Sequence, residues 1–250
     1  MATILETRGL SKRFGGLIAT DNISFRLEDG ARHALIGPNG AGKTTFINLL
    51  TGILAPTAGE ILLDGNAITG MSAERRVRAG LVRTFQINQL FPAMTPLETL
   101  GLAVSERMGG GRDWWRATGS KTEIVREMIE VAERFRLIDV LEEPTSKLPY
   151  GKQRLLEMAV AFACRPRVLL LDEPAAGVPE AERHELLATL ADLPGDVSVL
   201  LIEHDMDLVF SFADRISVLV NGALFREGSV AEISGDPNVR AVYLGDAIDG

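Results

Sequence analysis

A glycine-rich segment is the feature that most constrains how this chain of 250 residues can fold. It runs Gly37-Pro-Asn-Gly-Ala-Gly-Lys43-Thr44 and fits the spacing G-x-x-x-x-G-K-S/T. Glycines allow the backbone to bend so that successive N–H groups converge on phosphate oxygens, and a following helix N-terminus adds partial positive charge. We therefore predict a phosphate-binding loop, made of Gly37, Pro38, Asn39, Gly40, Ala41, Gly42, Lys43, Thr44 and Thr45.

The flanks of this loop support the prediction. A strand is expected to end at Ile36, and a helix is expected to follow because Phe46 and Leu50 lie on one apolar helical stripe. In such a loop Lys43 would reach the β- and γ-phosphates of a nucleotide, and the Thr44 hydroxyl would ligate Mg²⁺. A glycine-rich turn that matched the spacing by chance would need neither flank.

Two carboxylates at the end of a later apolar strand fit the same chemistry. Asp172 and Glu173 follow the run Val168-Leu-Leu-Leu171. We expect Asp172 to hold Mg²⁺, directly or through water, and Glu173 to act on the attacking water as general base or orienting group. The alternative is that both acids merely cap the next helix.

The N-terminal part of the chain favours short strands joined by turns. Between Asn22 and Glu28 apolar residues alternate with polar ones, which is typical of a half-buried strand, and Asp29-Gly30 supplies a turn. Residues 31–36 and 60–64 are predicted as two further strands. We expect these strands to form a small antiparallel sheet.

Later the pattern changes to strands that alternate with a helix. Strands are predicted at 168–171, 197–202 and 215–220, and Pro179 opens a helix between the first two. This alternation predicts an α/β core with a parallel sheet.

The stretch between Ile87 and Pro149 has helical periodicity instead. Ile124, Met128 and Phe135 lie on one face of a predicted helix. We interpret this stretch as a helical insert in the α/β core.

Composition excludes several classes of protein. The net charge of −8 argues against a general nucleic-acid binder, which would carry a basic face to neutralise phosphates. Cys164 is the single cysteine, so the chain can form no internal disulfide and no cysteine-rich zinc site. The longest apolar run, Met158 to Cys164, is far shorter than a membrane span of ~18 residues.

Five motifs occur in an order that resembles one family. They are Gly37–Thr45, Thr84-Phe-Gln86, Leu148-Pro-Tyr-Gly-Lys-Gln153, Leu169-Leu-Leu-Asp-Glu-Pro174 and Leu201-Ile-Glu-His-Asp205. With these motifs the chain resembles an ATP-binding-cassette (ABC) ATPase over almost its whole length. The resemblance implies ATP hydrolysis coupled to transmembrane transport, with ATP and Mg²⁺ bound.

The resemblance also implies an architecture. The fold would be α/β, a P-loop NTPase with a RecA-like core, an N-terminal antiparallel β subdomain and an inserted α-helical subdomain. Residues 1–86 and 160–250 would form the β subdomain and the core of a single ABC ATPase domain. Residues 87–159 would form the helical subdomain with the signature segment.

Three further site residues follow from the resemblance. Phe14 would stack on adenine, Gln86 would contact Mg²⁺ and the water, and His204 would contact the γ-phosphate. The implied catalytic set is then Glu173, His204, Gln86 and Lys43, and the implied metal set is Thr44, Gln86 and Asp172. The alternatives are a core aromatic at Phe14, a solvent-facing glutamine at Gln86 and a structural histidine at His204.

The segment Leu148–Gln153 resembles the signature motif, which in this family binds the ATP held by the opposite subunit. The usual form is Leu-Ser-Gly-Gly-Gln, but here Pro149 stands at the serine position and Tyr150 at the first glycine. Tyr150, Gly151 and Lys152 are the implied contacts with that ATP. Pro179 also replaces an aspartate that is frequent in the family, so the parts that act on a partner subunit are altered.

These departures resemble one subgroup. Arg13-Phe-Gly-Gly16, Arg83-Thr-Phe-Gln86, Leu148-Pro-Tyr-Gly151, Asp172-Glu-Pro-Ala-Ala-Gly177 and Val242-Tyr-Leu-Gly245 are similar to the ATPases of bacterial branched-chain amino acid importers and their amide, urea and aromatic-acid relatives. The resemblance implies a peripheral subunit at the cytoplasmic face of the inner membrane. Its partners would be a second ABC ATPase, in a heterodimer or homodimer, permease subunits contacted by the helical subdomain, and indirectly an extracytoplasmic solute-binding protein.

Three alternative functions stay open at this point. The chain could be the ATPase of a lipid or polysaccharide exporter, which a gene neighbourhood without a binding protein would favour. It could be a soluble cassette ATPase that remodels nucleic acid or ribosomes, although such proteins typically carry two cassettes or long inserts. A non-catalytic binding module conflicts with the presence of both Glu173 and His204.

Overall fold

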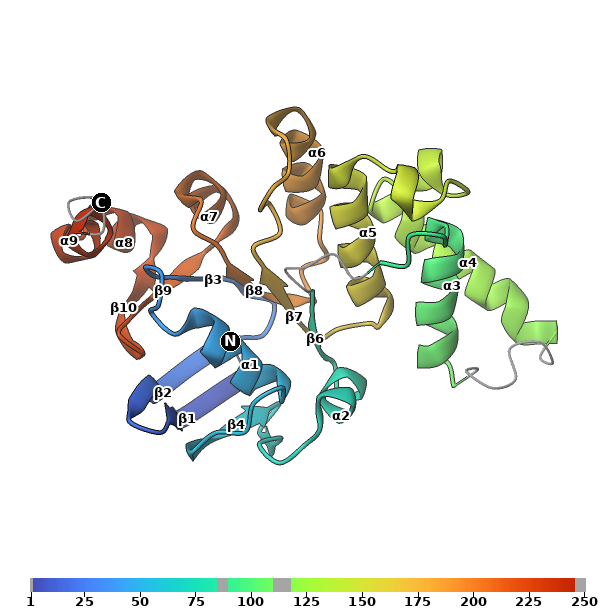
Figure 1. The fold of residues 1–250 in the computed structure, drawn as a ribbon. Helices are drawn as coiled ribbons and strands as arrows, with labels where there is room; N and C mark the ends of the chain where they lie inside the picture. The colour runs from blue at the N-terminus through green and yellow to red at the C-terminus, as the bar shows by residue number, and fades with distance from the viewer. Residues whose placement is uncertain (1, 85–89, 110–117, 246–250) are drawn as a thin grey trace. The chain divides into compact units, whose positions relative to one another are not determined.

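The chain folds into two compact units. The computed structural model describes residues 2–84, 90–109 and 118–245, with the backbone alone for 118–121 and 243–245. Unit 1 comprises Met1–Leu81, Arg167–Glu173 and Gly195–Gly250, and unit 2 comprises Val82–Pro166 and Pro174–Pro194 (Figure 1). These units are defined by compactness, and the predicted domain boundaries near residues 86 and 160 stay a prediction.

Unit 1 contains a small antiparallel sheet. Its strand order is β2-β1-β4-β5, with bounds β1 (Thr3–Phe14), β2 (Leu17–Glu28), β4 (Ala58–Leu63) and β5 (Asn66–Ala67). In β2 the alternation predicted from the sequence is present: Ile23, Phe25 and Leu27 are buried and their neighbours are exposed. The antiparallel β subdomain is therefore confirmed.

The second sheet of unit 1 is mainly parallel. Its strands follow the order β10-β9-β3-β8-β7, with bounds β3 (Arg32–Ile36), β7 (Val168–Asp172), β8 (Ser198–Ile202), β9 (Arg215–Val220) and β10 (Ala223–Ser229). Neighbours among β9, β3, β8 and β7 pair parallel, and β10 pairs antiparallel with β9. The predicted α/β core is confirmed, and the chain passes to unit 2 along β6 (Leu81–Arg83).

The strand at residues 31–36 does not join the small sheet, so that part of the prediction is wrong. β3 pairs parallel with β8 on one side and β9 on the other. Its last four residues, His33 to Ile36, are all buried, as expected for a strand that is covered on both faces. The alternation in the preceding strand and the short turn at Asp29-Gly30 favour a hairpin. The apolar residues at the end of β3 instead place this strand inside the parallel sheet.

Helices cover both faces of the parallel sheet. α1 (Lys43–Thr51) packs between the two sheets of unit 1, because its residues Phe46 and Leu50 share one core with Phe25 of β2 and Leu200 of β8 (Figure 1). The opposite face carries a second core that includes Ile36, Val209 and Ile233. The helices on that face are α7 (Met206–Phe212), α8 (Val230–Gly235) and α9 (Pro237–Gly245), while α2 (Ala73–Arg78) lies between β5 and β6 in the chain.

A buried arginine holds the C-terminal end of α1. Arg76 of α2 has only 1% of its surface exposed. Its guanidinium donates hydrogen bonds to the carbonyls of Leu49 and Leu50 at 2.6 Å each, Thr69 at 2.8 Å and Met71 at 3.1 Å. A cation at this end complements the negative end of the helix dipole and donates to two carbonyls of the last turn of α1.

Unit 2 is built from helices. They are α3 (Pro96–Arg107), α4 (Thr118–Arg134), α5 (Tyr150–Ala163) and α6 (Glu180–Ala191), with 3₁₀ turns at Ile138–Val140 and Thr145–Lys147. α5 contacts α3, α4 and α6, and the apolar stripe predicted for residues 124–135 faces inward at Met128 and Phe135. Across the described residues of both units, no helix is long and apolar enough to span a bilayer.

His33 lies at the centre of a buried polar network in β3, the strand that leads into the glycine loop. Only 1% of its surface is exposed, and its Nε2 lies 2.8 Å from the Ser217 hydroxyl, which donates to Glu227 at 2.8 Å. Glu227 also accepts from Arg215 at 2.7 Å. Burial lowers the pKa of His33 from 6.5 to about 4; Glu227 opposes this shift and Arg215 adds to it.

This network makes the stability of the protein depend on pH in a defined window. Below pH 6.5 the unfolded chain gains a proton at His33 that the folded chain excludes down to about pH 4. We expect this residue to lower the free energy of unfolding by about 3 kcal/mol as the pH falls through that window, and to leave it unchanged above. Urea unfolding of the wild type and His33→Gln at several pH values measures this contribution. His184→Gln, at an exposed histidine, is the control, and an equal slope in His33→Gln and wild type would contradict the assignment.

Candidate nucleotide-binding site

The glycine loop between β3 and α1 requires glycine for steric reasons. Gly37 has φ of 155°, and a Cβ there would lie 2.2 Å from the carbonyl oxygen of Leu219. Gly42 has φ of 99°, and its Cβ would lie 2.4 Å from the carbonyl oxygen of Ala19. L-residues rarely adopt such backbone angles, and the neighbouring backbone leaves no room for a side chain.

Backbone hydrogen bonds fix the shape of this loop. The Ala41 N–H donates to Pro38 at 3.2 Å, and the Ala41 carbonyl accepts from the Gly222 N–H at 2.9 Å. Gly42 is the N-cap of α1 and offers no side chain to cap its first turn. The N–H groups of that turn therefore point toward a ligand site with the positive end of the helix dipole behind them.

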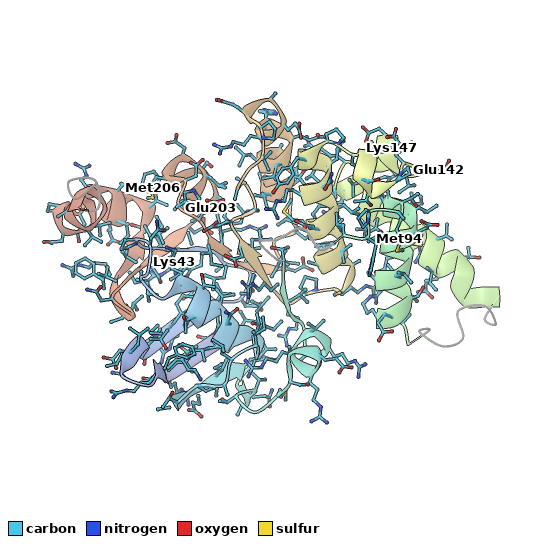
Figure 2. The ribbon with its side chains drawn as sticks, in the orientation of Figure 1. Lys43, Met94, Glu142, Lys147, Glu203 and Met206 are labelled. Carbon is cyan, nitrogen blue, oxygen red and sulfur yellow. The ribbon has the colours of Figure 1, made fainter. Side chains whose placement is uncertain are left out.

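Lys43 is the first residue of α1 and folds back over the loop. Its ammonium donates to the carbonyl of Gly37 and, at 3.0 Å, to that of Pro38. Figure 2 labels the Lys43 side chain. Burial lowers the pKa of Lys43, while the charges of Glu173 and Asp172 oppose that shift. The predicted lysine and the two predicted carboxylates are thus brought together in unit 1.

The two carboxylates occupy different environments at the end of β7. Asp172 is its last residue and has 4% of its surface exposed. Glu173 follows with φ of 47°, and its N–H donates to the carbonyl of Ile202 at 2.9 Å. A left-handed backbone at a glutamate costs of order 1–3 kcal/mol and persists where the surrounding structure fixes it. Its side chain is 24% exposed, so it is accessible to a water molecule.

The donor set suits a magnesium ion that arrives with a nucleotide. Thr44 is exposed on the first turn of α1, and Asp172 supplies a carboxylate. Within the residues that the structure describes, no group of three or more His, Cys, Asp or Glu side chains could hold a metal ion. Mg²⁺ is commonly bound by one or two carboxylates together with phosphate oxygens and water, and this arrangement matches that pattern.

His204 stands beside Glu173 on the turn after β8. Its Nδ1 lies 3.9 Å from the nearer Glu173 oxygen and 3.6 Å from Glu203, and its side chain is 65% exposed. Asp205 then caps α7 by accepting the N–H groups of Asp207 and Leu208 at 3.1 and 3.2 Å. This turn presents the imidazole at the same sheet edge as Asp172 and Glu173.

Glu203 is a site residue that the sequence analysis missed. Its side chain is 1% exposed, although it adjoins the exposed His204 in the chain. Figure 2 labels Glu203. A charged residue at the end of the apolar strand Ser198–Ile202, directly before a histidine, was the signal in the sequence.

Two predicted ligand contacts stay predictions. Phe14 ends β1 at the hairpin that pairs it with Leu17, and 46% of its surface is exposed. The Lys12 ammonium lies 5.1 Å from its ring centroid. An exposed ring of this kind is available for stacking and is not a core aromatic. Gln86 lies in residues 85–89, outside the described residues.

The signature segment lies in unit 2, where its groups have internal partners. Pro149 is the N-cap of α5 and provides no side-chain cap. The Gly151 N–H donates to Glu182 at 2.6 Å, and the Tyr150 hydroxyl donates to Ala176 at 3.4 Å. The Lys152 ammonium contacts three oxygens, those of the Arg136 carbonyl at 2.5 Å, Asp139 at 3.1 Å and Glu185 at 3.0 Å. The predicted contacts of this segment with a partner's ATP stay a prediction.

The fold and the site together define a P-loop nucleoside triphosphatase. Unit 1 contains a parallel sheet with a glycine loop between a strand and a helix, and a lysine on that helix. It also carries two acids at the end of β7, which is separated from β3 by β8. The ABC transporter family model matches residues 20–176. The chain belongs to the ABC transporter family and is an ATPase of that family.

Relatives along the whole chain agree with this assignment. The chain is 42% identical to the high-affinity branched-chain amino acid transport ATP-binding protein BraF of Pseudomonas aeruginosa. It is 40% identical to LivG of Escherichia coli, which has the same description. Each alignment covers 98% of this chain and 98% of the relative. Among solved structures, the ADP conformation of an ATP-binding cassette of an ABC transporter is similar with a TM-score of 0.84. It is 30% identical and covers 98% of this chain and 100% of that one.

The position of Glu173 at the end of β7 predicts that its carboxylate is needed for ATP hydrolysis but not for ATP binding. We expect Glu173→Gln to bind ATP with an affinity within about twofold of the wild type and to hydrolyse it at least about 100-fold more slowly, because the predicted general base is lost. Calorimetry measures the binding and phosphate release measures the turnover. The exposed Glu74, in unit 1, gives the control Glu74→Gln. Turnover at the wild-type rate in Glu173→Gln would reject Glu173 as the base.

Proposed function

We propose that this chain is the ATP-hydrolysing subunit of an importer for branched-chain amino acids or related amides, urea or aromatic acids. The observation that carries the proposal is the identity of 42% and 40% to BraF and LivG over 98% of each chain. The loop, the lysine and the two acids in unit 1 support it, because one chain carries residues suited to bind the phosphates and to act on the attacking water. The names of these relatives favour import over the export of lipid or polysaccharide.

Each site residue has its own role in the proposed reaction. The N–H groups of the loop and the Lys43 ammonium bind the β- and γ-phosphates of ATP, and their charge opposes the negative charge that develops on the terminal phosphoryl group. Thr44 and Asp172, with Gln86, would hold Mg²⁺, which would neutralise phosphate charge. Glu173 accepts a proton from the attacking water, and His204 contacts the γ-phosphate.

A second ATPase subunit completes this site in the proposed assembly. The N-terminus of α5 would face the ATP of that subunit, with the Gly151 N–H as its backbone donor. Pro149 supplies neither a hydroxyl nor an N–H there, so a partner with the usual signature residues would compensate. Because Gly151 and Lys152 have partners inside unit 2, ATP would have to displace Glu182 from the Gly151 N–H.

The remaining partners follow from the same proposal. Permease subunits would receive the motion of unit 2, and an extracytoplasmic protein would deliver the solute. The subunit would work at the cytoplasmic face of the membrane. Since ATP can do work only if it favours one state over another, ATP binding would favour the closed pair of ATPase subunits and hydrolysis would reopen it.

Reconstitution tests this proposal. We expect vesicles that contain the cognate permeases and both ATPase subunits to hydrolyse ATP several-fold faster when the solute-binding protein carries a branched-chain amino acid, because the closed state is then reached more often. Amides, urea and aromatic acids are assayed in parallel, and Lys43→Ala controls for contaminating ATPases. Stimulation by none of these solutes, with intact Lys43-dependent hydrolysis, would reject the proposed import function while leaving the ATPase assignment in place.

A further inference from the structure

Glu203 is a buried carboxylate beside the hydrolytic residues that has no role in the mechanism so far. It lies in unit 1 directly after β8, and its side chain is 1% exposed. Burying a charged group is costly unless the group is hydrogen-bonded and paired with an opposite charge or a polar partner. Its contacts therefore indicate what it does.

The first set of contacts fixes the turn that carries His204. The Glu203 Oε2 accepts the backbone N–H of His204 at 2.9 Å and that of Asp205 at 3.3 Å. Two successive N–H groups converge on one oxygen, which restrains the backbone between β8 and α7. These are bonds to a charged acceptor, which are stronger than those to a neutral oxygen.

The second contact orients the imidazole itself. The same oxygen lies 3.6 Å from His204 Nδ1, and Oε1 of Glu173 lies 3.9 Å from that nitrogen. The Nδ1 edge of the ring thus faces two carboxylates, which leaves Nε2 as the nitrogen to meet a phosphate oxygen. One carboxylate oxygen of Glu203 is therefore shared between the backbone of the turn and the imidazole edge.

We propose that Glu203 is a positioning residue for ATP hydrolysis, which holds His204 through the backbone of its turn and through the Nδ1 edge of its ring. The inference rests on the proposed role of His204 at the γ-phosphate. A group that is displaced from a reacting phosphoryl group loses mainly transition-state contacts, so loss of Glu203 lowers kcat more than it raises KM.

Glu203→Gln tests the proposal, because it keeps the shape and an acceptor oxygen and removes the charge. We expect kcat for ATP to fall about tenfold while KM changes less than about twofold. Glu227→Gln, at another partly buried acid of unit 1 that is bonded to Arg215 and Ser217, is the matched control and keeps kcat within about twofold. Thermal melting and ATP calorimetry establish that each variant is folded and binds nucleotide.

A double-mutant cycle with His204→Ala separates positioning from a purely structural role. We expect Glu203→Gln to have no further effect on single-turnover hydrolysis once His204 is absent. A full tenfold fall that persists in the His204→Ala background, or a folded Glu203→Gln with unchanged kcat, would overturn the proposal. Wild-type turnover in His204→Ala would instead reject the role of His204 itself.

A second variant keeps the test decisive if Glu203→Gln melts too low for assay. Glu203→Asp keeps the carboxylate with a shorter reach, and we expect its kcat to lie between the wild type and His204→Ala with KM little changed. A kcat for Glu203→Asp equal to that of the wild type or of His204→Ala would contradict positioning by a carboxylate at this distance.

Discussion

The convergence of backbone N–H groups at the start of α1 is the constraint on which the rest of the structure depends. It exists because Gly37 and Gly42 adopt backbone angles that other residues rarely take, with the carbonyls of Leu219 and Ala19 packed where side chains would stand. Both sheets of unit 1 therefore contribute to the loop: β9 on one side and β2 on the other. The Arg76 guanidinium anchors the far end of the same helix, so α1 is held at both termini.

The parallel sheet places the site residues that follow β7 and β8 near this loop. β3, β7 and β8 run in the same direction, so the segments that follow them meet at one edge. The glycine loop follows β3. Asp172 is the last residue of β7 and Glu173 comes directly after it, while Glu203 and His204 come directly after β8. Residues that are far apart in the sequence are thus adjacent without any contribution from long loops, and the strained backbone of Glu173 shows how tightly this edge is determined.

Much of this arrangement could be predicted from the sequence, because each motif combines a short spacing with an apolar strand. The loop, Asp172 and Glu173 belong to this group, whereas His204 was predicted from the resemblance to the ABC family. The sheet that β3 joins was predicted wrongly, since a turn at Asp29-Gly30 describes only local geometry and strand pairing is decided by distant partners. Glu203 was missed for a related reason: its function depends on burial and on backbone N–H groups, which a one-dimensional pattern does not show.

Calorimetric titration of Mg·ATP into the wild type and Gly42→Ala tests whether the geometry of the glycine loop creates the nucleotide site. A Cβ at residue 42 would meet the carbonyl of Ala19 at 2.4 Å and would force the loop out of shape. We expect saturable binding of one nucleotide to each wild-type chain, and at least a tenfold weaker affinity in a variant that still melts cooperatively (about 1.4 kcal/mol of binding free energy). Equal affinity in a folded Gly42→Ala would contradict the claim that this loop geometry creates the site.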